Sequence, residues 1–220
     1  VTIIFQAIGK STKKLAAIPE GGEILDVVGP LGTASHFDDS VKKAAVIGGG
    51  LGCAIAYPQA KHLFKKGVSV DMIAGFKTKD IIILEDEMKA VCDNLYIATD
   101  DGSYGTKGFV TDVLKREIEK GVKYDVVVAI GPLIMMKFVS QLTKNYGIKT
   151  IVSMNPIMID GTGMCGGCRL TVNGETKFAC VDGPDFDGHQ VDFDETMRRL
   201  SMYDGMQKRE ENCRLEGMSK

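Results

Sequence analysis

The sequence of 220 residues has no tryptophan and only three histidines. It also has no apolar run approaching the roughly 20 residues that span a bilayer, so we expect no membrane partner. It also has no excess of positive charge. The 27 Lys and Arg are interspersed with 29 Asp and Glu, which argues against a nucleic-acid partner. The histidines (His36, His62 and His189) are scattered, and no catalytic triad, side-chain acid or nucleophile is evident.

A signal peptide is not recognisable, and three of the six cysteines are clustered instead of being spread along the chain as disulfide partners. Together these features favour a reducing, cytoplasmic compartment. The chain opens without an initiator Met, directly on an apolar stretch, which we interpret as a fragment of a longer protein. Its length allows one large domain or two small ones.

The clustered cysteines, Cys165, Cys168 and Cys180, fall within sixteen residues. A plant-type [2Fe-2S] loop reads C-x4-C-x2-C with a distant fourth cysteine, and here Asp160 stands where the first cysteine would be. A carboxylate can bind iron through oxygen, so Asp160 is a candidate fourth ligand. A loop that wraps a cluster needs positive φ angles, and four glycines lie in it: Gly161, Gly163, Gly166 and Gly167.

Two plainer interpretations of this loop stay open. The three cysteines, with or without Asp160, could form a zinc site, because CxxC is common in zinc knuckles. Alternatively, Asp160 could be a turn residue beside a three-cysteine cluster, since Asp before Gly is ordinary turn chemistry.

From residue 41 the chain alternates between apolar strands and helices, which predicts an α/β fold with a five-stranded parallel sheet. The expected strands are 44–47, 68–74, 95–99, 125–130 and 149–152, and the expected helices are 53–66, 85–91, 111–120 and 133–144. Asn173-Gly174 predicts a β-hairpin with a type I′ turn between strands 169–172 and 175–179. A helix is expected from residue 193 to about Tyr203.

A glycine loop, Gly48-Gly49-Gly50-Leu51-Gly52, follows the first of these strands and precedes a helix, which is the context of a dinucleotide-binding loop. The match to G-x-G-x-x-G is imperfect because Cys53 replaces the third glycine, so a tight structural turn stays open. Asp71 lies about 20 residues further on, where a ribose-binding acid could stand. It falls inside a strand, so we do not assign it that role.

Residues 1–37 contain two apolar stretches predicted as strands, Val1–Gln6 and Glu23–Val28. Between them, Gly9-Lys-Ser-Thr12 is typical of a helix start. A capped helix and an anion site at its N-terminus are both compatible with this pattern.

Three segments carry a family resemblance: NPIMIDGTGMCGGC at 155–168, KFACVDGPDFDGH at 177–189 and RRLSMY at 198–203. They resemble the small (alpha) subunit of NADH-dependent ferredoxin:NADP oxidoreductase, or sulfide dehydrogenase, a ferredoxin-reductase-like family. A more distant resemblance is to the electron-transfer subunit of dihydroorotate dehydrogenase, which has four cysteines.

The closer resemblance implies three parts. Residues 1–38 would be the remnant of an FAD-binding β-barrel, 39–154 an NAD(P)-binding domain, and 155–220 the [2Fe-2S] domain and tail. It implies a cluster held by Asp160, Cys165, Cys168 and Cys180. FAD would lie near Gly9, Ser11 and Thr12, with Gly29 and Gly32 as further cofactor-binding residues at the junction between the barrel and the nucleotide domain. NAD(H) or NADP(H) would lie near Gly48, Gly49, Gly50, Gly52, Asp100, Gly131 and Pro132.

The resemblance also implies an electron-transfer subunit, in which a hydride passes from NAD(P)H to FAD and single electrons pass through the cluster. They would reach a larger iron–sulfur flavoprotein subunit, and ferredoxin indirectly. The alternatives are the electron-transfer subunit of a dihydroorotate dehydrogenase or of a hydrogenase diaphorase, and, in another class, a non-enzymatic nucleotide-binding zinc domain. Asp160 in place of a cysteine argues against the dihydroorotate dehydrogenase subunit.

Overall fold

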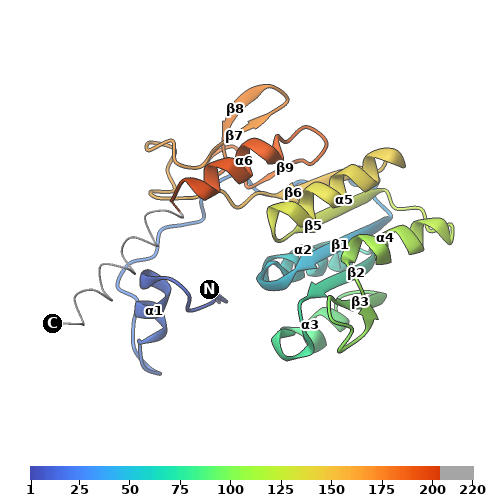
Figure 1. The fold of residues 1–220 in the computed structure, drawn as a ribbon, viewed down its shortest axis with the longest axis horizontal. Helices are drawn as coiled ribbons and strands as arrows, with labels where there is room; N and C mark the ends of the chain where they lie inside the picture. Colours follow the sequence, from blue (N-terminus) through green and yellow to red (C-terminus); the bar gives the residue numbers. More distant parts are fainter. Residues whose placement is uncertain (204–220) are drawn as a thin grey trace.

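A seven-stranded sheet forms the centre of the computed structural model, which describes residues 1–203 (Figure 1). Its strand order is β4-β3-β2-β1-β5-β6-β9, and every pair is parallel except β6 with β9. The strands are β1 (Lys43–Gly49), β2 (Ser69–Phe76), β3 (Asn94–Thr99), β4 (Thr106–Lys107), β5 (Val126–Ile130), β6 (Lys149–Ser153) and β9 (Asp185–Asp187).

The five predicted parallel strands are confirmed. Their apolar runs are continuous because helices cover both faces of the sheet, and all five residues of β5 are buried. The pattern did not reveal β4 and β9, which have two and three residues. A strand that short shows no periodicity, and β9 is recruited by its pairing with β6.

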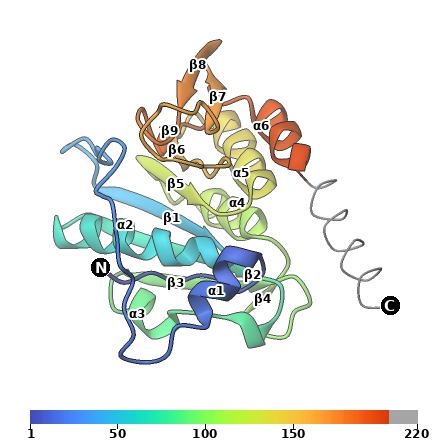
Figure 2. The same ribbon diagram turned by 90° about the vertical axis from the view of Figure 1, so that its left-hand side faces the viewer.

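Helices pack on both faces of the sheet, as strand–helix alternation requires (Figure 2). One face is covered by α2 (Cys53–Lys65) and α3 (Glu85–Lys89), with Leu63 and Met88 fully buried. The other is covered by α4 (Val110–Glu119) and α5 (Leu133–Asn145), with Leu114 and Met136 fully buried. Within residues 1–203 there are three short 3-10 helices: Gly50–Gly52, Lys79–Ile81 and Ser201–Tyr203.

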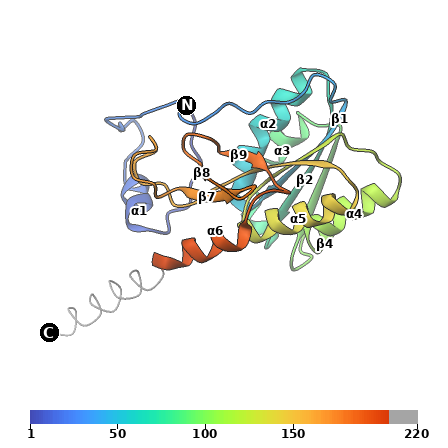
Figure 3. The ribbon, with the colours of Figure 1, turned by 90° about the horizontal axis from the view of Figure 1, so that it is seen from above.

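The predicted hairpin is present as β7 (Arg169–Val172) and β8 (Glu175–Phe178). Asn173 and Gly174 have φ angles of 52° and 76°, the positive pair that a type I′ turn needs. After β9, α6 (Phe193–Leu200) lies beside α5, where Lys137 and Asp194 form an ion pair at 2.7 Å (Figure 3). Among residues 1–203, no helix has the length and apolarity to cross a membrane.

The N-terminal segment departs from expectation. The predicted strands Val1–Gln6 and Glu23–Val28 are wrong for this structure, which has no strand before β1. Isolated apolar segments without a pairing partner leave their backbone groups unsatisfied and do not hold a strand. Their large apolar side chains are exposed: Val1, Ile3, Ile4, Phe5, Ile24, Leu25, Val27 and Val28. The division into three domains, including a flavin-barrel remnant, stays a prediction.

The predicted helix start at Gly9-Lys-Ser-Thr12 is confirmed by α1 (Lys10–Ala16). The Thr12 hydroxyl accepts from the Gly9 N–H at 3.0 Å and so caps the helix start. In Figure 1, α1 lies apart from the sheet. Residues that follow it are attached near β9: Thr33 N–H donates to Gly183 C=O at 2.6 Å, and the Ser35 hydroxyl donates to Asp185.

Candidate functional site

The carboxyl ends of the parallel strands bring together loops that are far apart in sequence. Gly48–Gly52 follows β1, and Gly131-Pro132 follows β5, its neighbour in the sheet. The chain leaves β1 toward β2 on one side and enters β5 on the other, so this is the topological switch point of the sheet. Open α/β sheets bind ligands in the crevice at such a point.

Close packing between these two loops explains most of the glycines. A Cβ on Gly52 would collide with the Ile130 carbonyl, one on Gly49 with Met135 and Pro132, and one on Gly48 with Cys53. A Cβ on Gly131 would lie 3.0 Å from the backbone of Gly49, which is also a tight contact. These residues therefore have a structural role whether or not a nucleotide binds.

Gly50 differs from its neighbours. Its φ angle is +54°, and no atom lies within 4 Å of the position that a Cβ would occupy. The helix α2 begins three residues later, so its first N–H groups and the positive end of its dipole lie at this loop. The space in front of Gly50 is where a ligand's phosphate groups could enter.

The third loop at this edge follows β3. Asp100 is exposed, and its N–H donates to the carbonyl of Phe76, the last residue of β2, at 3.1 Å. Asp101 accepts hydrogen bonds from Ser103, and Thr99 exchanges two with Tyr104. The loop is thus a defined structure that places the Asp100 carboxylate beside the end of β2, facing solvent.

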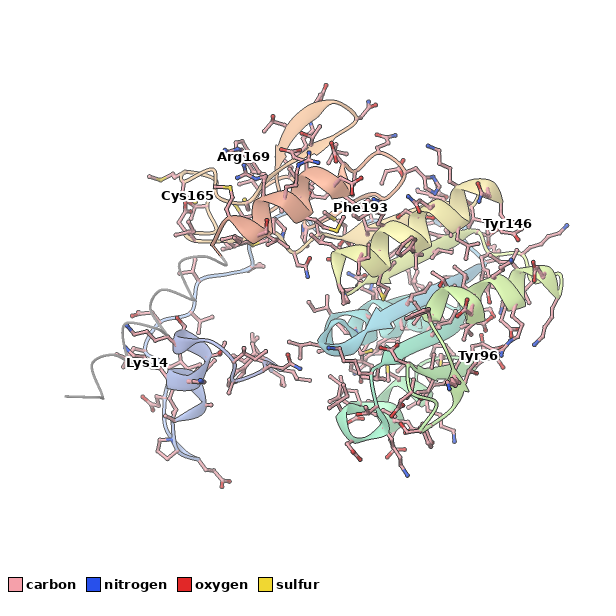
Figure 4. The ribbon with its side chains drawn as sticks, viewed as in Figure 1. Lys14, Tyr96, Tyr146, Cys165, Arg169 and Phe193 are labelled. Atoms are coloured by element: carbon pink, nitrogen blue, oxygen red, sulfur yellow. The ribbon has the colours of Figure 1, made fainter. Side chains whose placement is uncertain are left out.

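The cysteine loop leads into the β7–β8 hairpin. Cys168 stands just before β7 and Cys180 just after β8, and their sulfurs lie 3.2 Å apart. Both side chains are buried, whereas Cys165, labelled in Figure 4, is exposed. The Gly167 N–H points to the Cys165 sulfur at 3.4 Å. The hydrogen bond from the Cys168 thiol and burial raise the pKa of Cys180.

Asp160 is held firmly within the same loop. Its Oδ1 accepts from the Thr162 N–H and hydroxyl, and its Oδ2 accepts from the Cys165 N–H at 2.8 Å. These hydrogen bonds lower the pKa of the exposed carboxylate, so it is anionic at neutral pH. Asp160 therefore acts as a turn residue in this structure. A carboxylate has about four lone-pair sites, so three accepted hydrogen bonds leave one free for a metal.

Within residues 1–203, no three His, Cys, Asp or Glu side chains are already gathered around one metal position. The donors nevertheless suit an iron–sulfur cluster. Two thiolates on one tetrahedral metal at about 2.3 Å would be roughly 3.8 Å apart, so the Cys168 and Cys180 sulfurs need to separate by only ~0.6 Å. Gly161, Gly163 and Gly166 all have positive φ, as a loop that wraps a cluster requires.

The candidate flavin residues are not gathered into a site. Gly9 and Thr12 bond to each other at the start of α1, and Ser11 and Gly29 are exposed. Gly32 lies against the Gly183 carbonyl, where a Cβ would collide. The structure therefore leaves their role in FAD binding as a prediction.

Sequence reasoning missed one contact between the two candidate sites. Asn155 Nδ2 donates to the carbonyl of Gly131 at 3.4 Å, which joins the start of the cluster segment to the loop after β5. In the sequence, the only sign of this contact is that Asn155 is the first residue of the NPIMID motif.

Asp71, the residue considered as a ribose-binding acid, is 2% exposed and bonded to Lys43, Asn94 and Tyr124, away from the carboxyl edge. It has no place in the nucleotide site.

Comparison with known proteins finds relatives both of the cysteine loop and of the chain as a whole. Residues 155–192 match the iron-sulfur cluster binding domain of dihydroorotate dehydrogenase B. The chain is 46% identical over 206 residues to a dihydroorotate dehydrogenase B (NAD(+)) electron transfer subunit homolog of Thermotoga maritima, covering 94% of this chain and 72% of the relative. It is 39% identical over 195 residues to that electron transfer subunit of a Geobacillus strain, covering 86% and 73%.

A solved structure is also similar. The NADH-dependent reduced ferredoxin-NADP oxidoreductase structure contains a chain 44% identical to this one, with a TM-score of 0.86, covering 96% of this chain and 75% of that one.

Fold and comparisons thus define a ferredoxin-reductase-like α/β fold that includes an iron–sulfur cluster binding domain. The chain belongs to the family of electron-transfer subunits related to dihydroorotate dehydrogenase B and NADH-dependent ferredoxin-NADP oxidoreductase.

Proposed function

We propose that Asp160, Cys165, Cys168 and Cys180 hold a [2Fe-2S] cluster, and that the loops at Gly48–Gly52, Asp100 and Gly131-Pro132 bind NAD(H) or NADP(H). The chain is an electron-transfer subunit of a flavin and iron–sulfur oxidoreductase, and an iron–sulfur cluster, FAD and NAD(H) are the cofactors consistent with its family. The assignment of residues to these cofactors is the proposal.

The observation that carries the proposal is the pairing of ligands within the cysteine loop. Cys168 and Cys180 lie with their sulfurs 3.2 Å apart, while Asp160 is tied to the backbone of Cys165 at 2.8 Å. Two irons would then each receive one pair of ligands, Cys168 with Cys180 and Asp160 with Cys165. When bound, such a cluster accepts and donates single electrons.

The chain's own contribution is positioning. The buried pair Cys168 and Cys180 is anchored by a hairpin packed on the core, whereas Cys165 lies at the exposed side of the loop. With Cys165 exposed, a bound cluster would be accessible to a partner protein from that side. At the carboxyl edge, the first N–H groups of α2 would receive a diphosphate, and Gly131-Pro132 would flank the nicotinamide.

The family consists of subunits that work with a larger catalytic subunit. We extend this to an iron–sulfur flavoprotein partner that exchanges electrons with ferredoxin. The five cysteines found free in residues 1–203 fit a reducing compartment, and a cytoplasmic location is part of the proposal.

Substitution of Asp160 tests the ligand assignment against the turn role. Asp160→Asn keeps a single acceptor oxygen, which can serve Thr162 or Cys165 but not both as the two carboxylate oxygens do, and it loses the anionic donor. If Asp160 binds iron, Asp160→Asn gives a labile cluster with a shifted electron paramagnetic resonance (EPR) spectrum, and Asp160→Cys assembles a cluster with a changed midpoint potential. If Asp160 is only a turn residue, Asp160→Asn loses one turn hydrogen bond but no iron ligand, so a cluster with the wild-type spectrum in this variant would contradict the assignment.

Asp182 provides the control. Its Oδ2 accepts from the Phe178 N–H at 2.6 Å, so it is also a turn carboxylate near a candidate ligand. Asp182→Asn preserves that acceptor. We expect it to leave the visible and EPR spectra unchanged, so that any effect at Asp160 is specific to that position.

A further inference from the structure

The hairpin places two thiols in contact independently of any metal. Arg169 pairs with Phe178 in the β7–β8 ladder, and the ladder continues outward because the Ala179 N–H donates to the Cys168 carbonyl at 3.2 Å. This register fixes the backbone directly after Cys168 and directly before Cys180. Their sulfurs are 3.2 Å apart, so an approach of about 1.2 Å would reach the length of a disulfide bond.

The remaining cysteines of residues 1–203 differ in exposure and reactivity. Cys53 is buried in the first turn of α2, and burial raises its pKa to about 12. Burial also raises the pKa of Cys92 to about 11. Neither lies in the cysteine loop. Cys165 is exposed, and only Gly166 and Gly167 separate it from Cys168.

We propose that, when the loop holds no cluster, Cys168 and Cys180 form an intramolecular disulfide, with a small-molecule disulfide such as oxidised glutathione as the oxidant. The exposed Cys165 sulfur attacks the oxidant first, forming a mixed disulfide and releasing one glutathione thiol. Cys168 then attacks the Cys165 sulfur and releases the second glutathione. Finally Cys180 attacks Cys168, and Cys165 leaves as a thiol after taking a proton.

The net reaction is balanced. Two protein thiols lose two electrons and two protons, and one oxidised glutathione becomes two reduced molecules. The product lies at Cys168–Cys180 because the hairpin register holds these two residues together, whereas the glycine loop imposes no such contact on Cys165. The disulfide closes the open end of the hairpin.

This disulfide would control cluster loading, an inference that rests on the proposed function because it takes Cys168 and Cys180 as iron ligands. The same two sulfurs cannot be joined to each other and bind iron. Oxidised protein would therefore be unable to accept a cluster until a thiol reductant opens the bond. The exposed Cys165 would be the thiol through which oxidant and reductant reach the buried pair.

Peptide mapping tests the disulfide without a cluster. Metal-free, reduced full-length protein is treated with oxidised glutathione, alkylated and digested with trypsin. Cys165 and Cys168 share the tryptic peptide 150–169, and Cys180 lies on 178–198. We expect these peptides to be cross-linked, with Cys165 alkylated. A disulfide internal to 150–169, or alkylation of both Cys168 and Cys180, would overturn the proposal.

Two further measurements test whether oxidation proceeds through Cys165 and whether the disulfide blocks cluster loading. Cys165→Ser should give the same cross-link more slowly, and an unchanged rate would contradict the entry role of Cys165.

Oxidised wild-type protein should take up less than a tenth of the iron and sulfide taken up by reduced protein, and dithiothreitol should restore uptake. Full uptake by cross-linked protein would overturn the control of loading. Mapping that shows the cross-link while reduced protein takes up no cluster would instead count against the proposed function alone.

Discussion

The open space at Gly50 gives the sharpest test of the nucleotide site. Gly50 has φ +54°, and nothing lies within 4 Å of its Cβ position. Asn and Asp tolerate this left-handed conformation better than other residues with a side chain. Gly50→Asp and Gly50→Asn therefore add side chains of matched size at matched backbone cost, and they differ only by one negative charge.

That charge would face the negative diphosphate of a bound nucleotide. Two unit charges about 4 Å apart repel by between ~1 kcal/mol in water and ~4 kcal/mol near a protein surface. The lower value corresponds to about a fivefold loss of affinity. We therefore expect Gly50→Asp to bind NADH at least about fivefold more weakly than Gly50→Asn, and the difference to shrink as salt screens the repulsion.

Titration of NADH by calorimetry or fluorescence measures this difference. The visible spectrum of the cluster is the control, because the cysteine loop is a separate part of the chain and should be unaffected. Equal affinities of the two variants at low salt, in folded protein, would refute the assignment of Gly48–Gly52 as the diphosphate loop and favour a purely structural turn.

Three further predictions concern other parts of the chain. Gel filtration of this 220-residue chain should leave well under one FAD per chain, because residues 1–37 form only α1 and expose their apolar side chains; stoichiometric retention would contradict this. Tyr124→Phe removes the 2.8 Å hydrogen bond to the buried Asp71 carboxylate and should lower the free energy of unfolding by about 1.5–3 kcal/mol in urea titrations, with no change in nucleotide affinity. The backbone N–H groups of Lys43 and Lys42 lower the pKa of Asp125, so its stabilising effect is present above the unfolded pKa of about 3.9 and is lost as the pH falls through the lower folded value. The difference in stability between wild type and Asp125→Asn should therefore be constant from pH 5 to 7 and should shrink below about pH 4.

The sheet was predictable because its signal is local. Val126 to Ile130 is a continuous β-branched and apolar run, and Asn173-Gly174 imposes its turn through φ angles alone. The N-terminal strands failed for the opposite reason. Val1–Gln6 has a strand-like composition, but a strand depends on a partner that composition does not reveal.

The sequence marks the candidate cluster residues but does not give their geometry. The spacing of Asp160, Cys165 and Cys168 marked the loop, yet only the hairpin register brings Cys180 to Cys168. Sequence also left open whether Asp160 is a turn residue or a ligand. The structure shows its turn hydrogen bonds, and a carboxylate with a free lone pair is able to do both.

The metal content of the isolated protein tests the central claim most directly. Iron, zinc and acid-labile sulfide are measured on protein purified without oxygen, together with its visible and EPR spectra. A chain that carries a [2Fe-2S] cluster gives about two iron and two sulfide per chain, a broad brown absorbance and an EPR signal on reduction. A colourless chain with one zinc and no sulfide would contradict the account.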